Sequence, residues 1–231
     1  MQVLGFSQQM LMGAMVSLQV AVCAFLMAMT IGTIASVLTL KKKTVFGAFW
    51  LVYASIFTGV PSLLVAFFFY YAGSDIIAGI TGLFGTEKRI DLTPFLAAIL
   101  ALGMVYGAYI ADLLRSAIRN VPKGQFEAAT VLQVKRRFFV PLIIVPQVIR
   151  IALPALTNMW IVVLKDTALI SLIGLKEIMA YAKIASGVTK EPFIFYLIAS
   201  LFFLLMTSLT YYVSKHMQHW SDRGAAVYGK E

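Results

Sequence analysis

Asp166 is a carboxylate near the end of a long apolar stretch, between Lys165 and Thr167. If that stretch is a helix that begins near Arg150, a rise of about 1.5 Å per residue places Asp166 roughly 22–24 Å along it. A carboxylate in apolar surroundings is costly unless it faces a cavity or a cation. Asp166 is therefore predicted to be the counter-charge of an ammonium, imidazolium or guanidinium group. The alternative is a structural pair with a neighbouring helix. Lys165 points about 100° away from Asp166 on a helix.

Other polar or irregular positions accompany this carboxylate. Asn158 and Thr167, on the same predicted helix as Asp166, add hydrogen-bonding groups. Gly59 and Pro61 interrupt an earlier apolar stretch and free backbone groups that need another partner. That partner is either a substrate cavity or the packing around a kink. Asp166, Asn158, Thr167 and Gly59 are therefore candidate substrate-binding residues.

Two further patterns lack a residue that their chemistry requires. Residues 224–230 fit the spacing of a phosphate loop, but Glu231 stands where a Ser or Thr must hold magnesium. His216 and His219 are three residues apart, with no third metal ligand in view. No nucleophile, base and acid constellation is visible. We therefore expect no enzyme activity, no metal and no cofactor in this chain, and any ATP-driven work must come from a separate subunit.

The most polar long segment, residues 122–146, predicts a short helix at a membrane surface. A proline followed by Gly124 suits the turn that opens a helix. Glu127 lies in the expected first turn, where a carboxylate favours the positive end of the helix dipole. Ala128 and Ala129 leave one face almost without side chains, so another protein can approach the backbone closely. The segment is predicted to be an interfacial helix offered to a soluble partner.

The composition requires that most of the chain lie in a membrane. Its 231 residues are 61% hydrophobic and 13% charged, about half the charge of a soluble domain. Because a membrane helix needs about 20 apolar residues, we expect one all-α bundle with five spans. Their approximate residues are 10–38, 46–71, 94–114, 150–171 and 193–213.

The distribution of Lys and Arg predicts the orientation of these spans. Cytoplasmic loops carry the excess of positive charge in membrane proteins. In the five-span arrangement the twelve cytoplasmic residues are Lys41, Lys42, Lys43, Arg115, Arg119, Lys123, Lys135, Arg136, Arg137, Lys215, Arg223 and Lys230. The five outer residues are Lys88, Arg89, Lys176, Lys183 and Lys190, and Arg150 and Lys165 are assigned to neither side. The N-terminus is thus expected outside and the C-terminus in the cytoplasm, and the net charge of +9 does not indicate nucleic-acid binding.

Smaller patterns predict local structure. The apolar spacing in residues 73–93 predicts a short interfacial helix in the first outer loop. Gly103 and Gly107 predict close helix packing, and Asp112 and Arg115 can pair on one helix face. Cys23, the single cysteine, is predicted to be a packing residue.

From Gly5 to about Lys215 the chain resembles ABC importer permeases for polar amino acids and opines. The residues that carry the resemblance are Gly124, Glu127-Ala128-Ala129, Ile143 and Pro146 of the "EAA" loop, together with Thr58–Pro61, Gly107–Asp112 and Leu164–Leu169. The resemblance implies the type I importer fold, in which the EAA loop is a coupling helix that docks on the ATPase subunit. It makes Gly124, Glu127, Ala128, Ala129, Lys135 and Arg136 candidate coupling residues. It also adds Tyr109, within the second of these stretches, to the candidate substrate-binding residues.

The resemblance also implies partners and a location. The expected assembly has two ATPase subunits, which would hold ATP and magnesium, a second permease subunit, and an external substrate-binding protein. It would reside in a bacterial inner membrane. We expect a single permease domain over residues 1–231, with a helical core of about 10–213, a coupling loop of about 116–146 and a cytoplasmic tail of 215–231.

Two positions depart from the family pattern. Gln133 stands where relatives usually have a glycine, which would suit a left-handed turn, and a non-glycine residue there costs roughly 1–2 kcal/mol. We therefore expect the hairpin after the coupling helix to be shaped differently. Thr58 stands where relatives usually have an arginine, whose role a partner permease would have to supply.

These patterns together predict an importer permease for a polar, basic amino acid such as histidine, arginine, lysine or ornithine, or for an opine. Transport would occur by alternating access, coupled to the separate ATPase. The rival interpretation is a proton-coupled secondary amino-acid transporter that uses Asp166 as a proton relay.

Overall fold

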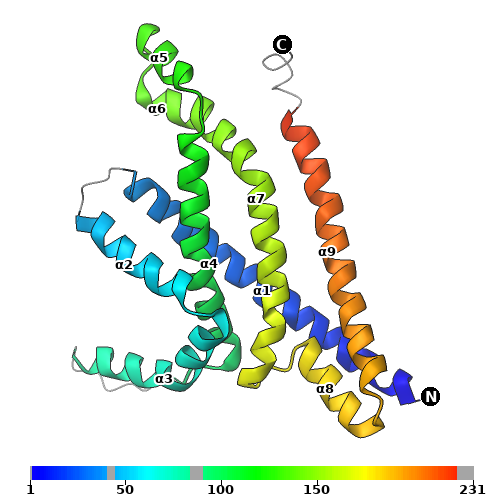
Figure 1. Ribbon diagram of the computed structural model, residues 1–231. Helices are drawn as coiled ribbons and strands as arrows, with labels where there is room; N and C mark the ends of the chain where they lie inside the picture. Colours follow the sequence, from blue (N-terminus) through cyan, green and yellow to red (C-terminus); the bar gives the residue numbers. More distant parts are fainter. Residues whose placement is uncertain (1, 41–44, 84–90, 223–231) are drawn as a thin grey trace.

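The computed structural model describes residues 2–40, 45–83 and 91–222, and in these the chain is helical (Figure 1). The α-helices are α1 (Gln2–Leu38), α2 (Val45–Gly59), α3 (Ser62–Gly82), α4 (Pro94–Arg119), α5 (Lys123–Val131), α6 (Arg136–Phe139), α7 (Val145–Asp166), α8 (Ile178–Thr189) and α9 (Pro192–Asp222). A π-helical turn (Val140–Ile144) joins α6 to α7, and a 3₁₀ helix (Thr167–Ile173) follows α7.

Five helical stretches of the described residues are long and apolar enough to cross a membrane, which confirms the predicted all-α bundle with five spans. They are Gly5–Leu38, Ser62–Gly82, Pro94–Arg119, Arg136–Ile173 and Pro192–His219. In Figure 1 the N-terminus lies at the lower end of the bundle, and the C-terminal end of α9 lies at the upper end, the end at which α5 and α6 also lie.

The predicted second span, residues 46–71, is wrong in its bounds. The chain breaks at Val60–Pro61 into α2 and α3, and α2 has only 15 residues. Because proline has no backbone N–H and fixes its own φ, the helix cannot continue unchanged through Pro61. In Figure 1 α3 leaves the direction of α2 and lies nearly across the upright helices. The separate interfacial helix predicted in residues 73–93 is also wrong, since residues 73–82 continue α3; residues 84–90 are not described.

The centre of the bundle is α4, which packs along α1. Glycines make this approach possible: a Cβ on Gly103 would lie 2.7 Å from Met27 Sδ, and one on Gly107 would lie 2.9 Å from Ile31 Cγ2. The predicted packing role of these two glycines is therefore confirmed. Cys23, by contrast, is exposed on α1 rather than packed in the core, so that prediction is wrong.

The last two spans are longer than predicted. The fourth is helical from Arg136 to Ile173 instead of beginning near Arg150, with a π-helical turn where Pro141 and Pro146 interrupt regular backbone bonding. The fifth continues as helix to Asp222, so the predicted cytoplasmic tail is an extension of α9 as far as it is described. The phosphate-loop pattern at 224–230 lies outside the described residues.

A buried carboxylate attaches α8 to α1. Glu177 caps the N-terminus of α8, where its Oε1 accepts from the Ala180 N–H at 2.9 Å, and its Oε2 accepts from the Ser17 hydroxyl at 3.1 Å. The two helices can come this close because Gly13 has no side chain: a Cβ there would lie 2.8 Å from the Ile178 nitrogen. Glu177 is completely buried, and burial raises its pKa from the ordinary 4.5 to about 7.

This raised pKa predicts a dependence of stability on pH. Between pH 4.5 and 7 the folded state binds the Glu177 proton more tightly than the unfolded state, so the stability of the folded protein should fall as pH rises through that window. With about 1.4 kcal/mol for each pKa unit, the loss is on the order of 3 kcal/mol. Thermal unfolding of the purified protein at pH 5 and pH 8 measures this loss of stability.

Two variants serve as controls. Glu177→Gln should remove the difference in stability between pH 5 and pH 8, whereas Glu191→Gln, at the exposed end of α8, should keep it. An equal pH difference in the Glu177→Gln protein would contradict the assignment.

Candidate functional site

Three helices meet at Asp166, the last residue of α7. Its Oδ2 accepts hydrogen bonds from the hydroxyl of Ser62 at 2.7 Å and from the hydroxyl of Tyr106 at 2.6 Å. Ser62 is the first residue of α3, and Tyr106 lies in the middle of α4. Both donors are neutral and both bind the same carboxylate oxygen. Hydroxyl donors therefore hold Asp166 in place, and its charge is not cancelled by either of them.

The break between α2 and α3 belongs to the same region. A helix that continued through Pro61 would use the Thr58 carbonyl, but the break frees it, and it accepts from the Tyr109 hydroxyl at 3.2 Å. Tyr109 lies one turn along α4 from Tyr106, with their ring centroids 6.0 Å apart. The sequence left open whether the freed backbone groups face a substrate cavity or are satisfied by packing around a kink. For the Thr58 carbonyl the partner is a protein side chain. Gly59 is exposed beside it, with no heavy atom within 4 Å of a Cβ built there.

The structure does not bring every predicted residue to this cluster. Thr167 is buried, and its hydroxyl donates to the Leu164 carbonyl at 2.7 Å, so it fixes the bend that follows α7. Asn158 is exposed on α7, two turns from Asp166 and on a different face. Sequence reasoning missed Ser62 and Tyr106. Tyr106 stands one helical turn before the predicted Tyr109, a spacing that could have indicated it.

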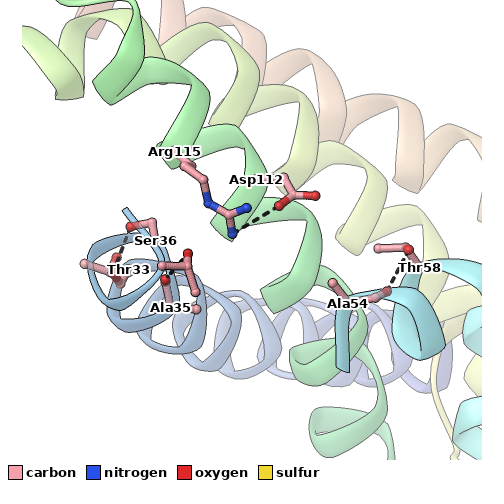
Figure 2. Close-up of polar contacts among 8 residues, drawn as sticks. Thr33, Ala35, Ser36, Ala54, Thr58, Asp112 and Arg115 are labelled. Carbon is pink, nitrogen blue, oxygen red and sulfur yellow. Dashed lines mark hydrogen bonds and ion pairs between the residues drawn. The ribbon is translucent and has the colours of Figure 1, made fainter. Parts of the chain in front are cut away.

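An ion pair joins two residues near the other end of α4. Arg115 and Asp112 pair at 3.3 Å, as predicted, and Figure 2 shows both side chains beside the end of α1. The Arg115 side chain is 16% exposed and that of Asp112 59% exposed. The same figure shows the Thr58 hydroxyl, which donates to the Ala54 carbonyl at 2.7 Å within α2.

The predicted coupling helix is α5, at the upper end of the bundle in Figure 1. Gly124, Glu127 and Ala128 are exposed, and Val131 joins them on the same face with 82% exposure. Ala129 instead lies inside the hairpin, 8% exposed, in a small core with Val121, Phe139 and Ile144. Of the two alanines, only Ala128 is therefore available to a partner.

The residues after α5 fold back against it. Phe126 on α5 meets Phe139 edge-on, with ring centroids 5.5 Å apart. Lys135 and Arg136 are both exposed at the start of α6. A cavity of about 230 Å³ lies in the hairpin and is lined by Phe126, Ala129, Thr130, Val134, Arg136 and Phe139. The hairpin therefore presents an exposed surface with a basic rim.

Gln133 has the left-handed backbone that a glycine would favour, with φ of 51°. Its N–H bonds the Thr130 carbonyl, and the next N–H, of Val134, bonds the Ala129 carbonyl at 3.0 Å. The expectation that the hairpin avoids this conformation is not met. The turn is present with glutamine in it, at the cost that a Cβ imposes on a left-handed residue.

Membrane-length helices, a hydroxyl-bound carboxylate between them and an exposed helix at one end define this protein as a membrane transport component. The chain belongs to the family described as binding-protein-dependent transport system inner membrane component, whose model matches residues 28–223. It is therefore a multi-pass inner membrane protein and an ABC transporter permease. The ATPase of such a transporter is a separate subunit, so the permease itself is not an enzyme. The family predicted from the sequence is confirmed.

Relatives and solved structures agree with this assignment. The chain is 34% identical over 221 residues to the nopaline transport system permease protein NocQ of Agrobacterium fabrum, covering 95% of this chain and 94% of that protein. It is 34% identical over 206 residues to the histidine/lysine/arginine/ornithine transport system permease protein HisQ of Escherichia coli, covering 89% and 90%. A crystal structure of an amino acid ABC transporter with histidines superposes with a TM-score of 0.80 at 25% identity, covering 94% and 96% of the two chains.

Proposed function

We propose that this chain imports a basic amino acid or an opine, as one of two permease subunits that surround a shared pathway. Relatives of this chain include permease proteins named for the transport of nopaline, of octopine, of arginine, and of histidine, lysine, arginine and ornithine. All of these molecules carry a cationic or basic group. The observation that carries the proposal is Asp166, a carboxylate at membrane depth whose described hydrogen bonds come from neutral hydroxyls. A cationic substrate would compensate its charge during passage.

The residues take two roles in this proposal. Asp166 binds the cation of the substrate, Tyr109 and Gly59 border that site, and Asn158 and Thr167 are second candidates on the same segment. Gly124, Glu127, Ala128, Lys135 and Arg136 couple the permease to the ATPase, with Ala129 as the internal support of that helix. ATP and magnesium bind in the ATPase pair, whose closure moves α5 and opens the bundle outward to an external binding protein. Residues 1–231 act as one permease domain.

Co-purification tests this assignment. A tagged copy of this chain, expressed with the ATPase, the second permease and the binding protein of its own transport system, should bring down an ATPase in stoichiometric amount. Its ATP hydrolysis in lipid nanodiscs should rise when binding protein and L-arginine are added. Transport by the purified chain alone, driven by a proton gradient and indifferent to ATP, would contradict it.

The proposed orientation puts α5 in the cytoplasm and α8 outside. The support is the charge distribution, since Lys123 and the basic residues of α6 lie at one end and Lys183 at the other. In a Cys23→Ala background, Lys183→Cys should react with an impermeant thiol reagent in intact cells, and Lys123→Cys should react only after lysis. Both positions are exposed, so the comparison is matched. Labelling of Lys123→Cys in intact cells would reverse the orientation.

A further inference from the structure

Lys165, the neighbour of Asp166, is a cation at the end of α7. It is exposed in the last turn of α7, within the stretch Arg136–Ile173 that is long enough to span the membrane. Among the described residues it makes no ion pair. An ammonium at this depth is costly in contact with lipid tails and is expected to face a cavity or an anion.

A cavity of about 370 Å³ lies against Lys165. Its lining is Lys165, Ala168, Met179, Ser200, Phe203, Leu204 and Thr207, from α7, the 3₁₀ helix, α8 and α9. The volume lies in the roughly 300–1,000 Å³ range of small-molecule sites. No carboxylate is among the lining residues. The cavity therefore presents a positive charge that nothing in its described walls neutralises.

Thr207, one of the residues that line this cavity, has a hydroxyl that is not used elsewhere among the described residues. This hydroxyl is buried and has no hydrogen-bond partner in the described part of the chain. Other threonines of the bundle behave differently, since the hydroxyls of Thr157 and Thr210 donate to the carbonyl four residues earlier. Ser200 contributes a second hydroxyl, which donates to the Tyr196 carbonyl at 2.8 Å. An ammonium with a free hydroxyl donor complements an oxyanion.

The face of α7 that carries Lys165 also carries a second exposed polar side chain. Asn158 is seven residues earlier, two helical turns away on the same face, and is also exposed. A larger cavity of about 440 Å³ between α1, α7 and α9 has no charged residue in its lining. Its threonine and serine hydroxyls are already bonded, as in the 2.6 Å contact between Thr157 and Ser214. Of the two cavities, the one at Lys165 fits an anion.

We propose that Lys165, with Thr207 and Ser200, forms a subsite for the carboxylate of the transported molecule. This proposal rests on the proposed function, in which Asp166 takes the cationic group. Lys165 and Asp166 are adjacent and point about 100° apart on the helix. One turn of α7 thus offers opposite charges to the two ends of a zwitterion, which selects molecules that carry both a cation and a carboxylate.

Binding of two matched probes tests the subsite. L-Arginine and L-argininamide differ in that the amide lacks the carboxylate, and both keep the guanidinium. Equilibrium binding is measured on the complete permease–ATPase assembly in nanodiscs, without the binding protein. The unmodified protein should bind arginine more tightly than the amide by about 10- to 100-fold, the range of one charge-assisted hydrogen bond.

The Lys165→Gln variant should bind arginine only as tightly as it binds the amide, and its affinity for the amide should be unchanged. Lys165→Arg should restore the preference, and Thr207→Val should weaken it.

Controls separate this result from its rivals. Lys183→Gln, an exposed lysine on α8 outside the cavity, should leave both affinities unchanged. If Lys165→Gln weakens arginine and amide binding equally, or weakens neither, the subsite is overturned. ATP-driven uptake by the unmodified protein would still support the proposed function in that case. Native mass spectrometry tests whether the cavity holds a lipid phosphate instead. That assignment would follow if a phospholipid stays bound to the unmodified protein and is lost from Lys165→Gln, while the preference for arginine is unchanged. If the unmodified protein binds neither L-arginine nor L-argininamide, a basic amino acid is ruled out as its substrate, and this subsite with it.

Discussion

ATP-driven uptake should fall to background when Ala128 is replaced by tryptophan. Ala128 is exposed on α5 between Glu127 and the apolar Val131, on the face proposed to meet the ATPase. An indole there would separate two surfaces that approach closely. Overpacking a fitted contact costs about 1–3 kcal/mol, and each 1.4 kcal/mol is tenfold in affinity. Uptake of labelled L-arginine into proteoliposomes of the complete assembly measures the effect.

Two other substitutions at this helix separate coupling from folding. Ala128→Ser keeps the side chain small and should preserve uptake. Ala129→Trp should instead disturb the hairpin itself, because Ala129 is buried against Phe139 and Ile144, and should lower the yield of folded protein. Normal ATP-driven uptake by a well-folded Ala128→Trp protein would remove the basis for calling α5 a coupling helix.

Replacing Asp166 by asparagine should weaken transport of a cationic substrate by about ten- to a hundredfold, because a lost charge-assisted hydrogen bond is worth roughly 1.5–3 kcal/mol. Asparagine keeps the shape, and its carbonyl oxygen can still accept from Ser62 and Tyr106, whose hydroxyls now bond Oδ2. Folding should therefore be preserved. L-Arginine and L-citrulline are a matched pair of substrates, since citrulline has a similar shape without the guanidinium charge. Competition assays should show loss of the arginine preference and little change for citrulline.

The hydroxyl donors provide the control for this experiment. Tyr106→Phe and Ser62→Ala each remove one hydrogen bond to Asp166 and leave its charge. A purely structural role predicts that both variants, and Asp166→Asn, lower complex yield and affect arginine and citrulline alike. A substrate role predicts that only Asp166→Asn changes the preference between them. Unchanged arginine transport by Asp166→Asn would rule out the carboxylate as the counter-charge.

The sequence by itself determined the class of fold and the position of the short exposed helix α5, for which we propose the coupling role. Both depend on properties that are local along the chain. Apolar length decides which segments can span a membrane, and basic residues between them predict the orientation. The glycine and small residues around Glu127 indicate a short exposed helix whatever surrounds it. The count of five spans and the packing role of Gly103 and Gly107 were predicted for the same reason.

The partners of the buried polar groups were decided only by the tertiary structure. Ser62 and Tyr106 are 104 and 60 residues from Asp166 in the chain, and no local pattern pairs them. Likewise Glu177 meets Ser17 across 160 residues, where Gly13 lets the two helices approach. The exposure of Ala128 and the burial of Ala129 depend on how the hairpin folds back on α5. A span is defined by composition within one segment, whereas a site in a helical bundle is defined by which faces of different helices meet, and packing alone fixes that.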